Sequence, residues 1–202
     1  MNDDRQRHHR RSIRLKGYDY AQAGAYFITV VTYDRECLFG DVVENEMRLS
    51  DYGSIVQDEW TKSAVLRPRV MLDAFVVMPN HVHGIITLAD DDGRGTLQRR
   101  GTWQRRGTLQ RAPTFERFGK PTSDSIPTIL RLFKSATTKR INEMRETPGM
   151  PVWQRNYYEH IVRNESSLDR IRQYIFDNPA RWAIDRENPQ AIAREPEEAW
   201  RP

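Results

Sequence analysis

Two strand-like runs near the middle of the chain are separated only by a proline-containing dipeptide. Residues 69–78 and 81–88 are apolar or alternate in polarity, and Pro79 and Asn80 lie between them. Such runs of this length favour strands. Because proline removes a ladder donor, the dipeptide must form a bend or a tight connection. The sequence therefore predicts two strands with a sharp bend between them.

The second run opens with two histidines, His81 and His83, one residue apart. Side chains at positions i and i+2 of a strand leave the same face of the sheet. Both imidazoles would then project side by side, at a separation that one divalent cation can bridge, while Val82 points into a core. Half-exposed polar alternation would give the same spacing. The pair suggests a metal site, and other residues of the chain are needed to distinguish a ligand pair from polar alternation.

Other segments are rich in β-branched and aromatic residues, which favour strands. A central strand is predicted over residues 26–33 and a short strand over 38–43. Residues 152–163 are predicted to be a strand or an extended segment. We therefore expect a sheet built from segments far apart in the sequence.

Three segments carry apolar residues at helical spacing. The first helix is predicted from Ser50, its cap, to about Lys62. A longer helix is predicted from Ser125 and ends before Pro148 and Gly149. The third is predicted over 167–177, where Ser166 and Asp169 resemble a capping box.

Arginine-rich segments lie outside these elements. Lys and Arg number 32 against 28 Asp and Glu, and the isoelectric point of about 9.3 conceals this uneven distribution. Residues 1–16 are predicted to be a basic arm, either a solvated tail or a phosphate-binding segment. A Gly-Thr-Leu/Trp-Gln-Arg-Arg hexad recurs between about 90 and 124, at a period that fits neither a helix nor a solenoid. We interpret it as a disordered insertion. It is either a repeat expansion without specific function or a segment that binds single-stranded nucleic acid.

One domain is predicted over residues 17–182, followed by a polar, loosely attached tail over 183–202. A length of 202 residues with 30% charged residues suits one domain with appendages. Cys37 is the only cysteine, which excludes disulfides and cysteine-based zinc sites and favours a reducing compartment. The apolar runs are too short to cross a bilayer. We expect a cytoplasmic, nucleoid-associated protein without a membrane partner.

Tyr174 and Asn178 stand four residues apart on the last predicted helix, so they lie on one of its faces. A tyrosine beside an apolar stripe can be a packing residue at the edge of the core. Near a metal site and basic surfaces it can instead attack a phosphodiester and form a covalent phosphotyrosine. An amide oxygen of Asn178 could complete the coordination sphere.

The ordered combination of these motifs resembles the single-tyrosine HUH transposases of the insertion-sequence-200-like group, and most closely the REP-associated tyrosine transposases. The resemblance covers roughly residues 11–182, interrupted by the hexads. The residues that carry it are Met78-Pro79-Asn80-His81-Val82-His83-Gly84, Trp153-Gln154-Arg155, Tyr158-Glu159-His160, Arg163 and Tyr174-Ile175-Phe176-Asp177-Asn178-Pro179, with 14–20 and 26–29 upstream.

The resemblance implies an α+β fold, a ferredoxin-like antiparallel sheet with helices on one face, that forms an HUH nuclease domain. His81 and His83 match metal-binding histidines of the family, Tyr174 matches its nucleophile and Asn178 its third polar ligand. The implied cofactor is Mg²⁺ or Mn²⁺. The implied reaction cleaves and rejoins single-stranded DNA through a 5′-phosphotyrosine.

The implied partner is single-stranded DNA with a nearby hairpin, bound by a monomer or a homodimer. Tyr157 and Tyr158 are rival nucleophiles on position alone, although only Tyr174 matches the motif before Asn-Pro. Candidate DNA contacts come from the basic arm, the long helix and the segment after it. They are Arg11, Arg14, Arg131, Lys134, Arg155 and His160.

Two functions of other classes are alternatives. A zinc-dependent deaminase needs a His-x-Glu motif and a following Pro-Cys-x-x-Cys, and the chain has neither. The other alternative is a catalytically silent, domesticated protein that binds hairpins or other nucleic acid. Intact His81, His83, Tyr174 and Asn178 favour the enzyme.

Overall fold

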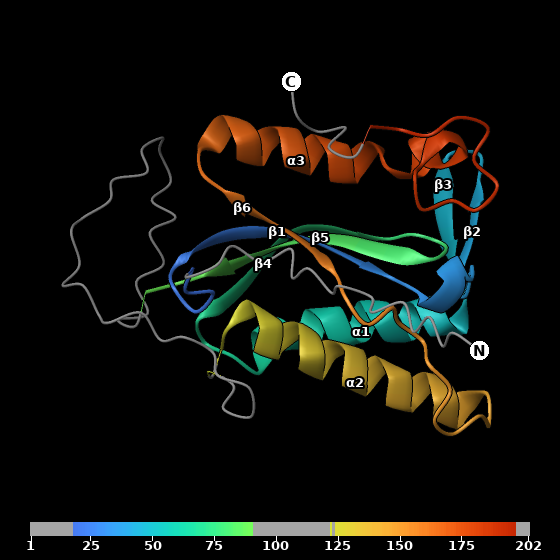
Figure 1. Ribbon diagram of the computed structural model, residues 1–202, viewed down its shortest axis with the longest axis horizontal. Coiled ribbons are helices and arrows are strands. Elements are labelled where there is room, and N and C mark those ends of the chain that lie inside the picture. The colour runs from blue at the N-terminus through green and yellow to red at the C-terminus, as the bar shows by residue number, and fades with distance from the viewer. Residues whose placement is uncertain (1–17, 91–121, 123, 197–202) are drawn as a thin grey trace, which may run out of the picture.

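A computed structural model describes residues 18–90, 122 and 124–196 of the chain. Four strands form one antiparallel sheet in the order β4-β5-β1-β6 (Figure 1). Their bounds are Gly24–Val31 for β1, Val70–Val77 for β4, His81–Leu88 for β5 and Tyr158–Val162 for β6. The two central strands, β1 and β5, are buried along nearly their whole length. Both faces of the sheet must therefore be covered.

Helices cover the two faces. Helices α1 (Asp51–Val65) and α2 (Ile126–Met144) pack on one face, and α3 (Glu165–Asp177) lies on the other (Figure 1). The predicted α+β class with an antiparallel sheet is confirmed. The expectation of helices on one face holds for α1 and α2 only, because the apolar stripe of α3 packs against the opposite face.

The connectivity is that of a ferredoxin-like fold. The sheet strands and the first two helices follow each other as β1, α1, β4, β5, α2 and β6. A hairpin of β2 (Gly40–Val43) and β3 (Glu46–Leu49) is inserted before α1. Only β2 was predicted. The turn residues Glu44 and Asn45 both have positive φ, as a two-residue primed turn requires, but their sequence lacks the glycine that usually marks one.

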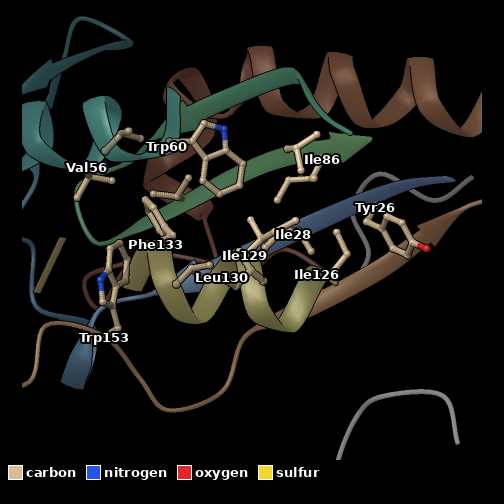
Figure 2. Close-up of a cluster of buried hydrophobic side chains, with 14 of the residues drawn as sticks. Tyr26, Ile28, Val56, Trp60, Ile86, Ile126, Ile129, Leu130, Phe133 and Trp153 are labelled. Atoms are coloured by element: carbon tan, nitrogen blue, oxygen red, sulfur yellow. The ribbon is translucent and has the colours of Figure 1, made fainter. Parts of the chain in front are cut away.

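Side chains alternate between two cores. Tyr26 and Ile28 of β1 and Ile86 of β5 point toward α1 and α2, where Trp60 and Phe133 complete the larger core (Figure 2). The intervening residues of β1 and β5 point toward α3. They contact its stripe in a smaller cluster of Ala25, Phe27, Ile85, Val162, Leu168, Ile171 and Ile175. The candidate site lies beside this smaller cluster.

The helix starts were predicted in two cases of three. The Ser50 hydroxyl accepts from Gly53 N at 3.2 Å, and the Ser125 hydroxyl accepts from Thr128 N at 3.4 Å. The capping box predicted at Ser166 is wrong. Asn164 caps α3 instead, with its side-chain oxygen 2.8 Å from Ser167 N.

The segment after α3 is packed, as far as residue 196. A 3₁₀ helix, η2, spans Pro179–Ile184, and the Glu195 amide donates to the Ile184 carbonyl at 3.0 Å. Asp185 is only 2% exposed, and Glu195 forms a 2.6 Å ion pair with Arg181. The expectation of a loosely attached segment is therefore wrong for 183–196. It failed because polar residues were taken as solvated, whereas here they pair with one another.

Several expectations concern residues outside the described part of the chain. The basic arm over 1–16 and almost all of the hexad segment lie there. The described chain leaves the sheet after Leu88, which pairs with Gly24 and Val70 at the end of β5 opposite His81. Among the described helices, none combines the length and the apolar character that crossing a bilayer needs.

Replacing Gly84 with alanine should destabilise the protein by about 1–3 kcal/mol, because the new methyl group would collide with the Trp60 indole in a packed core. Urea unfolding measures this change. Gln57→Ala on the exposed face of α1 is the control and should stay within about 0.5 kcal/mol of the parent protein. Equal stability of both variants would contradict the packing described here.

Candidate active site

His81 and His83 lie side by side on the face of β5 that α3 covers. Their ring centroids are 4.5 Å apart, and both side chains are buried. In the sheet they pair with Val31 and Thr29 of β1. The juxtaposition predicted from strand geometry is confirmed. The alternative of half-exposed polar alternation is excluded by the burial.

One nitrogen of each ring is held by a neighbour. His83 Nδ1 lies 2.8 Å from the Thr29 hydroxyl, and His81 Nδ1 lies 2.9 Å from Asn80 Oδ1. His81 Nε2 is buried and has no hydrogen-bond partner among the described residues. Burial lowers the pKa of both histidines, and for His83 the neighbouring His81 lowers it further. Both imidazoles are therefore neutral near pH 7, the state in which they bind metals.

Asp185 completes a cluster that the sequence did not reveal. Its Oδ2 lies 3.7 Å from His81 Nε2, and one ligand atom from each of His81, His83 and Asp185 lies within 4.8 Å of the others. The residue follows η2, in a stretch that was interpreted as a solvated tail. The available signal was its place eleven positions after Tyr174, close enough for the chain to turn back onto the same face. Two imidazoles and a carboxylate form a donor set suited to a divalent cation.

Tyr174 projects from α3 toward this cluster. Its hydroxyl lies 3.5 Å from His83 Nε2, and the two rings are 5.3 Å apart between centroids. Burial, followed by the charges of Asp185 and Glu195, raises the pKa of Tyr174, while Asn178 and Arg181 act in the opposite direction. The phenol is therefore protonated near pH 7 and needs a proton acceptor before it can act as a nucleophile.

Asn178 ends α3 and is fully buried. Its amide lies against His81 and Tyr174 and acts on the pKa of each. Neither amide atom has a hydrogen-bond partner within the described chain. A buried amide without partners is costly; a bound cation would satisfy its oxygen, and a water would accept from its nitrogen. Its placement is compatible with the ligand role that the family resemblance implies.

The rival tyrosines fall on different faces. Tyr158 lines the same cavity of about 150 Å³ as His83 and Tyr174, whereas Tyr157 packs against the larger core. Tyr174 is the tyrosine whose hydroxyl approaches a histidine of the pair. The structure therefore brings together His81, His83, Tyr174 and Asn178, and it adds Asp185.

The candidate DNA contacts are spread over the molecule. Arg131 and Arg155 are exposed, on α2 and on the segment that follows it. His160 pairs with Phe27 on the site side of the sheet. Arg11 and Arg14 lie outside the described residues. A larger cavity of about 740 Å³ lies between α2 and residues 148–155, and none of the clustered site residues lines it.

Lys134 has a structural position that its sequence context did not indicate. Its ammonium donates to the carbonyls of Gln154, Arg155 and Asn156 at 2.6, 3.2 and 3.1 Å. Burial lowers its pKa to about 8. These contacts tie the segment before β6 to α2, so the ammonium is occupied within the protein.

Known proteins with similar sequences and structures show the family and the fold of this chain. No family model matches the chain. An uncharacterized protein of Haemophilus influenzae is 42% identical over 179 residues, which cover 88% of this chain and 92% of that protein. The chain belongs to one family with that protein. A second H. influenzae protein, named as a REP-associated tyrosine transposase, is 23% identical over 81% of this chain and 74% of its own length.

A solved structure, described as a REP-associated tyrosine transposase bound to a REP hairpin, has a TM-score of 0.51 and 20% identity to this chain. The match covers 79% of this chain and 68% of that one. The chain has the REP-associated tyrosine transposase fold. The resemblance predicted from the motifs is therefore confirmed, and the four-stranded sheet with its helices is the shared fold.

Lys134→Met should lower the free energy of unfolding by about 1–3 kcal/mol, because three carbonyls lose a common donor. Lys139→Met, on the same helix, is the control, since Lys139 is exposed and its pair with Glu143 is a long one of 3.8 Å. Urea unfolding and binding of a labelled single strand would be measured on both variants. Unchanged stability with lost DNA binding would contradict the structural role and favour a DNA contact.

Proposed function

We propose that this protein is a transposase that cleaves and rejoins single-stranded DNA, with Tyr174 as the nucleophile. The observation that carries the proposal is the Tyr174 hydroxyl 3.5 Å from His83 Nε2, beside a buried His-His-Asp cluster. The transposase fold supports the reaction class. The fold supports only the class of reaction. The proposal that the reaction acts on single-stranded DNA through a tyrosine is based on these side chains.

A divalent cation, Mg²⁺ or Mn²⁺, would be held by His81, His83 and Asp185, with the Asn178 amide beside it. The fit rests on the buried, unpartnered Nε2 of His81 and the facing carboxylate. When bound, the cation would neutralise the charge that develops on the scissile phosphate. The carboxylate adds the hard oxygen that these cations prefer.

In the proposed reaction, the Tyr174 oxygen forms a bond to phosphorus and the bond from phosphorus to the 3′ oxygen breaks. A 5′-phosphotyrosine and a free 3′-hydroxyl result, and a second 3′-hydroxyl reverses the step. Three groups beside Tyr174 can accept its proton: His83 Nε2 and the carboxylates of Asp185 and Glu195. Because His83 Nε2 and Asp185 are assigned to the cation, we assign proton acceptance to Glu195.

The proposed substrate is single-stranded DNA with a hairpin. The support is that the solved transposase of the same fold is bound to a REP hairpin. Tyr174 reaches His83 within one chain, so the site needs no tyrosine from a partner. This arrangement supports action as a monomer, although a homodimer with two such sites is compatible with it.

Covalent trapping tests the nucleophile. Incubation with Mn²⁺ and labelled single strands from the DNA flanking the gene, in both polarities, should give an SDS-resistant adduct. Tyr174→Phe should abolish the adduct, and Tyr158→Phe should retain it, because Tyr158 lines the same cavity without the predicted role. Hairpin binding without an adduct on any strand would favour the silent DNA-binding protein, and loss of the adduct in the Tyr158 variant alone would move the nucleophile there.

Asp185→Asn should weaken Mn²⁺ binding by about tenfold or more, since the proposed ligand set loses its carboxylate. Titration followed by electron paramagnetic resonance measures the affinity. Glu187→Gln is the matched control, because Glu187 lines the same cavity but pairs with Arg35 at 2.8 Å. An equal effect of the two substitutions would argue for general electrostatics in place of ligation.

A further inference from the structure

Asn80 occupies the bend between β4 and β5, and its side chain is fully buried. The side-chain amide contacts three segments that are far apart in the sequence. Its nitrogen donates to the carbonyls of Arg35 at 3.0 Å and Glu187 at 2.7 Å. Its oxygen lies 2.9 Å from Nδ1 of His81.

These contacts fix which way the amide points. The Arg35 and Glu187 carbonyls only accept hydrogen bonds, so the amide NH₂ group must face them. The amide oxygen therefore faces His81, and because that oxygen only accepts, the His81 Nδ1 must carry a hydrogen. A neutral imidazole has one N–H group. Nε2 of His81 is consequently left with its lone pair free.

The other side of the ring favours the opposite arrangement. Asp185 Oδ2 lies 3.7 Å from His81 Nε2, too far for a hydrogen bond. A carboxylate facing that nitrogen would draw the proton to Nε2 if nothing held it at Nδ1. The 2.9 Å contact with Asn80 is the shorter of the two and holds the hydrogen on Nδ1. A lone pair and a carboxylate then face each other across a gap suited to a cation.

We propose that Asn80 is a positioning residue that fixes the tautomer of His81 and directs its Nε2 lone pair toward Asp185. The importance of this for metal binding rests on the proposed function. The tautomer itself does not, because it follows from contacts present without a cation.

The same amide also positions Asp185. The Glu187 carbonyl accepts from Asn80, and the Glu187 amide donates to Asp185 Oδ1 at 2.7 Å. Asp185 Oδ1 is thereby occupied, and Oδ2 is the oxygen that approaches His81. On the other side, Arg35 has a left-handed φ of 57° and its carbonyl meets the amide. One buried side chain thus sets the orientation of two of the proposed ligands.

Nuclear magnetic resonance tests this directly. The full-length protein would be labelled with ¹⁵N-histidine, freed of metal and kept at about pH 8, above the histidine reference pKa of about 6.5. The ¹⁵N shifts of Nδ1 and Nε2 distinguish protonated from unprotonated nitrogen, and His81→Gln assigns the signals. Asn80→Leu removes the acceptor with little change in size. Thr29→Val is the matched control, since it removes the partner of the other histidine.

The wild-type His81 should carry its proton on Nδ1, and Asn80→Leu should move it to Nε2. Thr29→Val should leave His81 unchanged. A proton on Nε2 in the wild type would overturn the proposal whether or not the variant folds, and so would an unchanged tautomer in a folded Asn80→Leu.

Mn²⁺ titration separates this inference from the proposed function. Asn80→Leu should weaken Mn²⁺ binding about 10- to 100-fold. Unweakened binding by this variant would overturn the positioning role. Absence of Mn²⁺ binding by the wild type, together with the expected tautomers, would remove the proposed metal function and leave the hydrogen-bond assignment supported.

Discussion

Strand β5 is buried on both faces, and its alternating side chains contribute to the larger core on one side and to the candidate site on the other. Val82 and Ile86 point into the larger core, and Gly84 admits the Trp60 indole between them. On the other face, His81 and His83 are taken out of water together. Ionised imidazoles cannot remain there without partners, so both rings are neutral, and Nδ1 of each ring is held by a specific neighbour. The strand therefore determines both the core and the chemistry of the site.

The hydrogen-bond partners of these nitrogens connect segments that are far apart in the sequence. Thr29 of β1 holds His83. Asn80 holds His81 and also donates to the carbonyls of Arg35, in the 3₁₀ helix after β1, and of Glu187, in the segment after η2. This last connection spans 107 positions. Tyr174 lines one cavity with Asp185 and Glu187 of this segment, and burial, followed by the charges of Asp185 and Glu195, raises its pKa. This raised pKa explains why a reactive tyrosine here would need a proton acceptor in addition to a cation.

The sequence was sufficient where residue type and local spacing determine the structure. Residue type and spacing predicted the strand-forming runs of β1, β4 and β5, the caps of α1 and α2, and the His81–His83 pair. Asp185 was missed because its burial depends on tertiary contacts, and the surrounding composition is that of a solvated segment. Lys134 was ambiguous for a related reason, since a lysine on a helix gives no sign of carbonyls contributed by another segment. The single-chain position of Tyr174 beside His83 likewise required the packing of α3.

Anomalous diffraction from crystals grown with Mn²⁺ is the most direct test of whether His81, His83, Asp185 and Tyr174 form one metal-binding tyrosine site. We expect a single strong peak about 2.0–2.2 Å from Nε2 of His81 and of His83, with a carboxylate oxygen of Asp185 as a further ligand. Tyr174 should adjoin the ion. Crystals in which Mn²⁺ binds elsewhere, or does not bind at saturating concentration, while both histidines contact only protein, would show that these residues do not form a metal site.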